Sequence, residues 1–355
     1  MYLPTSTHIL PLVNIRCERL LPHAGYVITH EGARVDADDV VAKTEAGGRH
    51  YIFDLARRLQ VSPAQADKYV RAKPGMALEQ GDTLAVRRTL LGLSRLSVRS
   101  PAKGTVIEVG NGRLLYEAAG SVFELRAGLS GVVVDVIPEH GVTIEATGAV
   151  VQGVWGSGRQ DFGLIKVVET DARAPIPAEA LDSSARGAIV VGHQADVALL
   201  RKAELNKVRG LILGSMPAAL LSMMRMLSFP VLITEGFGRR PMSELAWGLL
   251  AGNNGREAFV DARPTDRWNG RRPEVIIPLP SASSAMPVPA SGQPLKNGQR
   301  VRVLRAPFLG AVGKVKYMPP RAQYLPSGVL ALVAQVEQGD HTTITAPLAN
   351  LEILD

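Results

Sequence analysis

Five residues in the middle of the sequence have the types and spacing of a small ligand-binding site. Short apolar runs precede them, with His193 after the first run, Ser215 after the second and Glu235 after the third. When such runs form parallel strands, ligands bind outside the carboxyl ends of the strands. We therefore predict ligand-binding roles for His193, Ser215, Glu235, Gly236 and Gly238. His193 and Glu235 are candidates for an acid/base pair, although we favour helix-capping and turn roles for them.

The sequence contains no motif that is typical of catalysis, metal binding or cofactor binding. A glycine-rich stretch at 153–163 matches neither the P-loop nor the dinucleotide fingerprint, and we interpret it as a structural hairpin rather than an anion-binding loop. Because Cys17 is the single cysteine, an internal disulfide and a cysteine-rich zinc site are excluded. We therefore expect no catalytic residue, no metal and no cofactor.

Basic residues are concentrated between Arg49 and Arg113. This stretch holds 12 Lys/Arg against 5 Asp/Glu, and the difference of seven equals the net charge of the whole chain. A basic surface of this kind favours a polyanionic partner such as nucleic acid. The residues that we expect to contact nucleic acid here are Arg57, Arg58, Lys68, Arg71 and Lys73.

Two short helices are predicted inside this basic stretch, within residues 52–72. Asp54 and Ser62 are suitable N-caps, Pro63 suits a first helical turn, and Gln65 completes a capping box with Ser62. The pattern resembles the centre of a helix-turn-helix. Because strands are predicted on both sides, we favour a helical insertion that covers a β-barrel.

Glycine turns and alternating apolar residues predict strands through residues 25–122. The phrases Gly81-Asp-Thr-Leu-Ala85 and Pro101-Ala-Lys-Gly-Thr-Val106 resemble the lipoyl/biotinyl-like barrel-sandwich hybrid. That resemblance implies a barrel made of two half-barrels. Lys103 lacks the sequence context of a cofactor-carrying lysine, so a carrier role is not expected. Residues 123–171 repeat the same pattern and predict a second β-barrel-like repeat.

The pattern changes at residues 186–263, where apolar runs alternate with helical segments. Apolar strands joined by helices indicate a small parallel α/β domain with both faces covered, similar to Rossmann-like domains in its general fold. Residues 264–294 are rich in Ser, Ala and Pro and are predicted to be a linker.

The last segment, residues 295–355, resembles the KOW module of the NusG family and of several ribosomal proteins. The resemblance lies in Gly298, the alternating valines after it, a Pro-Phe turn, and Gly310 and Gly313 before Lys314. Strand alternation predicts that Val301 and Val303 point inward and that neighbouring arginines point outward. Family members bind RNA or protein, so the expected nucleic-acid-binding residues are Arg300, Arg302, Arg305, Lys314, Lys316 and Arg321.

Together these patterns predict a multidomain, β-rich protein with α/β structure, in which residues 1–24 are an N-terminal segment. We expect a non-catalytic, nucleic-acid- or ribonucleoprotein-associated binding protein whose partner is RNA or DNA. The alternatives are a scaffold that binds a protein or further copies of itself, and an enzyme or small-ligand sensor that uses the α/β domain. The single cysteine and the opening residues predict a cytoplasmic protein without membrane insertion.

Overall fold

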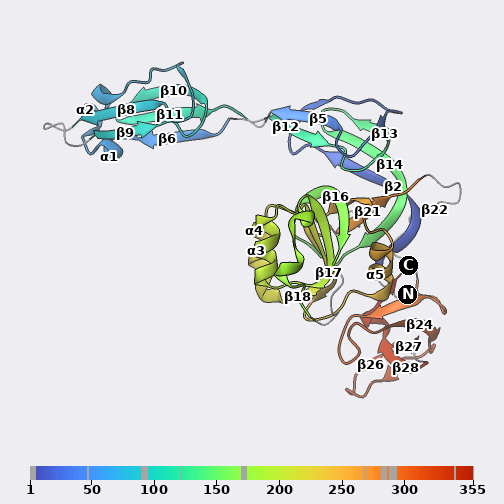
Figure 1. Cartoon of the computed structure of the whole chain (residues 1–355). Helices are drawn as coiled ribbons and strands as arrows, with labels where there is room; N and C mark the ends of the chain where they lie inside the picture. The colour runs from blue at the N-terminus through green and yellow to red at the C-terminus, as the bar shows by residue number, and fades with distance from the viewer. Residues whose placement is uncertain are drawn as a thin grey trace.

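The computed structural model describes residues 5–45, 48–88, 95–120, 122–168, 174–266, 268, 270–280, 286–287, 294–339 and 341–354. Strands dominate and belong to several sheets, which confirms the expected β-rich, multidomain architecture. Figure 1 shows four units, which we call the proximal module, the arm, the α/β layer and the C-terminal module. Among the described helices, none has the length and apolar character needed to cross a bilayer.

The proximal module combines two parts of the chain that lie on either side of the arm. Strand β5 pairs antiparallel with β12, although more than 70 residues separate them. The apolar side chains that alternate along β2, including Val13, Ile15 and Cys17, enter the same core as Ile144. Its strands are β2 (Ile9–Leu20), β3 (Tyr26–Val27), β4 (Arg34–Val35), β5 (Val40–Glu45), β12 (Val122–Arg126), β13 (Gly131–Ile137) and β14 (Gly141–Gln152).

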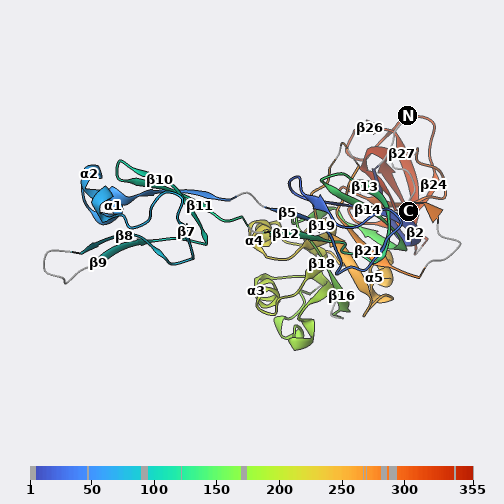
Figure 2. The same cartoon turned by 90° about the horizontal axis from the view of Figure 1, so that it is seen from above.

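The arm, residues 48–120, is an insertion between β5 and β12 and projects from the rest of the chain in both views (Figures 1 and 2). A four-stranded sheet, β6-β11-β10-β7, and a β8-β9 pair enclose its own core. Its elements are β6 (His50–Asp54), α1 (Leu55–Leu59), α2 (Pro63–Ala66), the 3-10 turn η1 (Asp67–Tyr69), β7 (Ala77–Leu78), β8 (Thr83–Arg88), β9 (Arg95–Arg99), β10 (Gly104–Gly110) and β11 (Arg113–Ala118).

The prediction of one barrel over residues 25–122 is wrong, because these residues belong to two units. Residues 25–45 pair with the strands that follow the arm, whereas residues 48–120 pair among themselves. The same glycine-and-alternation pattern serves both units, so reading it in chain order does not reveal which strands are partners.

The two predicted helices of the arm are present but short. Asp54 caps α1 by accepting a hydrogen bond from the Arg57 N–H, and the helix ends at Gln60 in a left-handed conformation. The Ser62 side chain makes no capping bond to α2. Helices of five and four residues are too short to lie along a DNA groove, which counts against the helix-turn-helix interpretation.

The α/β layer contains four parallel strands in the order β19-β18-β17-β16, which continue through antiparallel β20 and β21 into β14. Its strands are β15 (Trp155–Gly156), β16 (Gln160–Val167), β17 (Ala188–Gln194), β18 (Gly210–Met216), β19 (Val231–Phe237), β20 (Glu257–Asp261) and β21 (Glu274–Pro278). Its helical elements are η2 (Ala178–Ala180), η3 (Ser183–Ala185), α3 (Val197–Leu205), η4 (Ala218–Leu220), α4 (Leu221–Met226) and α5 (Glu244–Ala251).

Three strands of this sheet depart from the predicted domain organisation. Strand β16 was expected in a second barrel at 123–171, yet it is a parallel neighbour of β17. Strand β20 is antiparallel to β16 rather than part of the parallel set. Strand β21 lies within the predicted linker, 264–294, but Val275, Ile276 and Ile277 are fully buried between β20 and β14. A short strand beside proline-rich sequence has too little periodicity to be recognised.

The C-terminal module is a six-stranded sheet in the order β1-β29-β23-β24-β27-β28. The N-terminal strand β1 pairs in parallel with the last strand, β29, so the opening residues are not a separate segment. Its elements are β1 (Thr5–Thr7), β23 (Arg300–Val303), β24 (Val312–Tyr317), β25 (Gln323–Tyr324), β26 (Leu330–Ala331), β27 (Val333–Gln338), β28 (Thr343–Pro347), η5 (Leu348–Asn350) and β29 (Leu351–Leu354); a short β22 (Met286–Pro287) pairs with β2.

Candidate functional site

The five predicted ligand residues lie at the carboxyl ends of β17, β18 and β19, as the α/β pattern indicated. Ser215 is fully buried, and its Oγ accepts a hydrogen bond from the Arg240 N–H at 2.6 Å and donates to the Arg240 carbonyl at 2.7 Å. Gly236 and Gly238 adopt φ angles of +95° and +130°, which residues with a Cβ rarely adopt. These three residues therefore shape the loop that leads from β19 to α5.

His193 is held at the same edge by the segment that begins α5. Its Nδ1 accepts a hydrogen bond from the Met242 N–H at 3.1 Å, and its ring stacks on Trp247 with 4.1 Å between ring centroids. Glu235 instead accepts hydrogen bonds from the Ser243 N–H and from Arg302. Both side chains therefore contact the segment that leads into α5. Their ligand-binding roles stay a prediction.

Arg302 joins the α/β layer to the C-terminal module through a buried ion-pair cluster. Its guanidinium lies 2.5 Å from Glu235 Oε2 and 2.5 Å from Glu352 Oε2. Glu352 also accepts hydrogen bonds from Thr7 and Arg272. We call these five residues the junction cluster.

The expected outward, nucleic-acid-binding position of Arg302 is wrong. Arg302 does lie on the opposite face of β23 from Val301 and Val303, but the α/β layer covers that face and leaves only 3% of the residue exposed. Burial alone would lower the pKa of the guanidinium, yet the carboxylates of Glu235 and Glu352 raise it above its ordinary value. Burial likewise favours a higher pKa for Glu352, and Arg302 holds it below its ordinary value.

The other predicted cations of the C-terminal module are all exposed. Arg300 and Lys314 are cross-strand neighbours on β23 and β24 and line a groove. Lys316 pairs with Glu337 at 3.3 Å. Arg305 and Arg321 lie on exposed loops outside that groove's lining.

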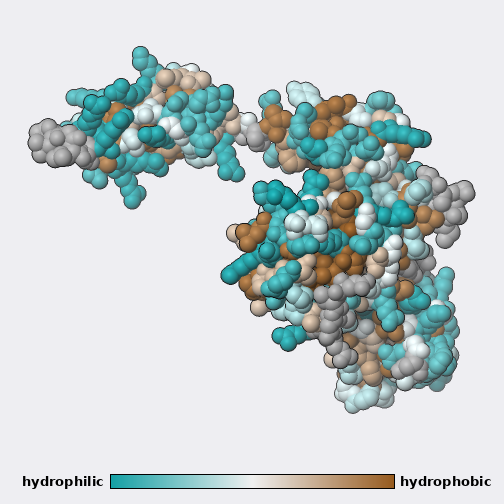
Figure 3. Space-filling view, in the orientation of Figure 1, coloured by the Kyte–Doolittle hydropathy of each residue, from teal (hydrophilic) through white to brown (hydrophobic). Residues whose placement is uncertain are grey.

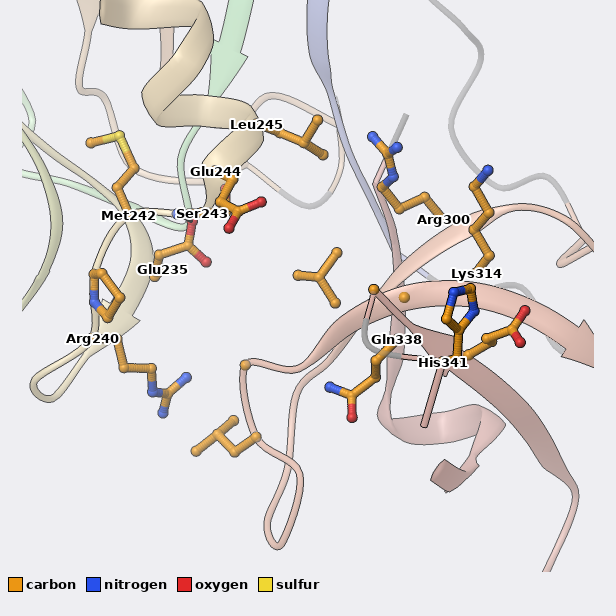
Figure 4. A pocket seen from close by; sticks show the side chains of 17 residues that line it. Glu235, Arg240, Met242, Ser243, Glu244, Leu245, Arg300, Lys314, Gln338 and His341 are labelled. Carbon is orange, nitrogen blue, oxygen red and sulfur yellow. Dashed lines mark hydrogen bonds between the residues drawn. The ribbon is translucent and has the colours of Figure 1, made fainter. Parts of the chain in front are cut away.

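The groove separates the α/β layer from the C-terminal module and encloses about 970 Å³. Figure 4 shows Arg240, Met242 and Glu244 on one wall, with Arg300 and Lys314 on the other. The sequence singled out Arg300 and Lys314 as cations. It did not show that they share a groove with Arg240, because Arg240 and Arg300 lie about 60 positions apart in the chain. Only the packing of the two units reveals it.

The five predicted cations of the arm are all exposed. Arg57 and Arg58 lie on α1, Lys68 lies on η1, and Arg71 and Lys73 follow η1 beside β8. Figure 3 shows that hydrophilic residues cover much of the arm on the face in view.

The structure adds arginines that the sequence analysis did not single out. Arg88 and Arg95 are direct cross-strand partners on β8 and β9, and both are exposed. Like charges at such positions repel each other. Arg87 has a different role, because its Nη1 donates to the carbonyls of Leu59 and Gln60 at the end of α1.

Few of the arm's cations are neutralised within the arm. Among its described residues, Lys103 is the one Lys or Arg that forms a salt bridge, with Glu79 at 2.8 Å. Asp54 accepts from the Arg57 N–H, and Asp67 accepts from the Gly112 N–H. The carboxylates nearest the helices therefore bind backbone groups instead of arginines, and the positive charge stays available to a partner.

A row of polar side chains crosses four adjacent strands beneath the proximal module: Gln152, Glu274, Asp261 and Gln160. Arg263 forms a salt bridge with Asp261 at 2.5 Å. Glu274 accepts a long hydrogen bond, 3.4 Å, from Gln152, and no salt bridge among the described residues involves it. Burial raises the pKa of Glu274 to about 7, although Gln152 opposes the shift.

Nothing in the described ranges resembles a metal centre, since no three His, Cys, Asp or Glu residues there converge on one point. Burial raises the pKa of the Cys17 thiol to about 12, so the reactive thiolate is scarce at neutral pH. No protein-family model matches the chain, and no curated protein matches it.

Proposed function

We propose that this chain is a non-catalytic, nucleic-acid-associated binding protein and that the arm makes the contacts to phosphate. The observation that carries the proposal is the arm's exposed and unneutralised positive charge, concentrated on a unit that projects from the remaining modules. Cations that replace the condensed counterions of nucleic acid provide most of the free energy of non-specific binding.

The distribution of the cations supports a phosphate-binding role. Arg88 and Arg95 repel each other across β8 and β9 in the free protein. A phosphate between two guanidinium groups replaces this repulsion with two charge-assisted hydrogen bonds. Binding therefore relieves an unfavourable interaction as well as adding favourable ones.

The folds expected from the sequence fit the same proposal. The arm would be a lipoyl-like barrel that carries no cofactor, and the C-terminal module a KOW-like barrel that docks a protein of the transcription or translation machinery. The α/β layer would be a Rossmann-like unit between them. In this scheme the C-terminal module contributes little to the grip on nucleic acid, because Arg302 belongs to the junction cluster.

The test is fluorescence anisotropy with a labelled single-stranded RNA and a labelled DNA duplex at ~50 mM salt, where phosphate contacts are strongest. The arm variant carries Arg57→Glu, Arg58→Glu, Arg88→Glu and Arg95→Glu. A matched variant carries Arg186→Glu, Arg201→Glu, Arg225→Glu and Arg256→Glu, which replace four exposed arginines of the α/β layer and change the net charge by the same amount.

We expect the arm variant to lose binding and the matched variant to retain it. The slope of log affinity against log salt should become shallower by roughly 0.7 to 0.9 for each lost phosphate contact. If the wild-type chain binds neither probe at ~50 mM salt, or if both variants lose the same affinity, the proposal is wrong.

An exposed apolar hairpin favours protein binding as a second function. On β25, β26 and the residues around them, Tyr324 is 77% exposed and Leu330 is 56% exposed. Contiguous exposed apolar side chains on a soluble unit commonly mark protein interfaces. Light scattering of the wild-type chain and of the Tyr324→Ser/Leu330→Ser variant tests whether this hairpin joins copies of the chain. A strictly monomeric wild type would exclude self-association through the hairpin.

A further inference from the structure

We propose that the groove between the α/β layer and the C-terminal module binds a phosphorylated small molecule of nucleotide size. The inference goes beyond the proposed function, because it concerns a different surface and a different class of ligand. It rests on the volume, the charge and the rigidity of the groove.

The size of the groove fits such a ligand. It encloses about 970 Å³, which is at the upper end of the range typical for sites of small molecules and cofactors. One wall is the loop and first turn around α5, which begin at the carboxyl end of β19. Ligands of open α/β sheets bind at this end of the strands.

Positive charge in the groove exceeds what its own acids neutralise. Arg300 and Lys314 are cross-strand partners, so two like charges lie side by side on one wall. Arg240 lies on the opposite wall (Figure 4). No salt bridge within the described residues involves any of these three cations.

Two of the three acids that line the groove already have cationic partners. Glu235 is paired with Arg302 in the junction cluster, and Glu337 is paired with Lys316. Glu244, in the first turn of α5, remains. Three cations therefore face one acid without a cationic partner, which favours an anionic ligand and in particular a phosphate that several donors can bind at once.

The remaining lining offers a place for the rest of the ligand. Leu245, Leu309 and Val312 add apolar surface to the walls, and Gln338 adds an amide. A site of this composition suits a molecule with a charged end and a flat or apolar body, because the apolar surface gives affinity and a few polar groups fix orientation.

The junction cluster gives the groove rigid walls. Arg302 connects Glu235, at the edge of the α/β layer, to Glu352 on β29 of the C-terminal module. The two walls are therefore held together before any ligand arrives. A preformed site loses less conformational entropy on binding than a flexible one.

The test is isothermal titration calorimetry of the full-length chain with pyrophosphate, AMP and adenosine as probes. Lys314→Gln and Arg300→Gln remove groove cations, and Arg321→Gln is the matched control, because Arg321 is an exposed cation of the same module that lies outside the groove lining. We expect pyrophosphate and AMP to bind with Kd below about 1 mM, and adenosine to bind far more weakly. Lys314→Gln and Arg300→Gln should each weaken AMP binding about tenfold or more, and Arg321→Gln should leave it unchanged.

The arm variant described above separates this inference from the proposed function. If the groove is the site, that variant binds AMP as the wild type does, even though it no longer binds RNA. Loss of AMP binding in the arm variant alone, equal losses in Lys314→Gln and Arg321→Gln, or no saturable binding of pyrophosphate and AMP would each overturn the inference.

Discussion

The arm and the junction cluster use the same residue type in opposite ways. In the arm, Arg88 and Arg95 are exposed and face each other without a carboxylate partner in the described structure. In the junction cluster, Arg302 is almost fully buried between Glu235 and Glu352. The first arrangement is unfavourable until an anion binds, whereas the second is complete within the protein. The surroundings of an arginine, and not its presence in a basic stretch, therefore indicate whether it serves binding or structure.

The largest change in folding stability is expected from a substitution that breaks the junction cluster. Arg302→Ala leaves Glu235 and Glu352 without their common cation, and removing one partner of a buried ion pair typically costs about 3 to 5 kcal/mol of folding free energy. Urea unfolding followed by tryptophan fluorescence measures the loss. Arg300→Ala, on the same strand but exposed, is the control and should change stability by less than about 0.5 kcal/mol. Equal effects of the two substitutions would mean that the buried pairing is not structural.

A second prediction concerns a buried carboxylate that lacks such a partner. Since the folded-state pKa of Glu274 is raised to about 7, ionisation of this group destabilises the folded state as pH rises from the unfolded-state value, about 4.5, through 7. Glu274→Gln should therefore stabilise the chain by about 3 kcal/mol at pH 8 and have almost no effect at pH 4. Urea unfolding at the two pH values measures the difference, and a gain that does not depend on pH would contradict the assignment.

A third prediction separates two neighbouring arginines within the arm. Arg87 donates to two carbonyls at the end of α1, so Arg87→Ala should cost about 1 to 2 kcal/mol of stability. Arg88→Ala should cost almost nothing, because its side chain has no salt bridge within the described arm. Thermal unfolding of both variants provides the comparison. If Arg88→Ala were the more damaging, its classification as a binding residue would be wrong.

The smallest expected change in stability is a gain rather than a loss. Arg88→Glu converts a repulsive cross-strand pair with Arg95 into an attractive one and should stabilise the β8-β9 hairpin by about 0.2 to 1 kcal/mol. Thermal unfolding at low salt measures the gain, which added salt should diminish. RNA affinity should fall in the same variant. A loss of stability would show that the two arginines do not repel each other in the free protein.

Sequence patterns predicted the strands and helices better than they predicted which strands pair with each other. The apolar runs of β17, β18 and β19 identified both the parallel strands and the polar residues at their ends. The pairing of β5 with β12 across the arm could not be predicted, because both strands are short and similar to the strands between them. The position of β21 inside a proline-rich stretch was missed for a related reason, since five residues carry too little periodicity.

The same limit applies to the candidate sites. The basic stretch between Arg49 and Arg113 was visible in composition and lies within the arm, although the arm itself was not predicted as a separate unit. The burial of Arg302 was not visible, since strand alternation gives the face of a side chain but not what covers that face. The groove was likewise hidden, because its two walls meet only through the packing of separate units.

The central claim is that the arm binds nucleic acid, whereas the junction cluster has a structural role between the α/β layer and the C-terminal module. Hydrogen exchange of the full-length chain, free and saturated with single-stranded RNA at low salt, tests it directly, since bound segments exchange more slowly. The account predicts protection of α1 and of β8 and β9, with no change on β23 and β29. Protection confined to the C-terminal module, with an unchanged arm, would contradict it.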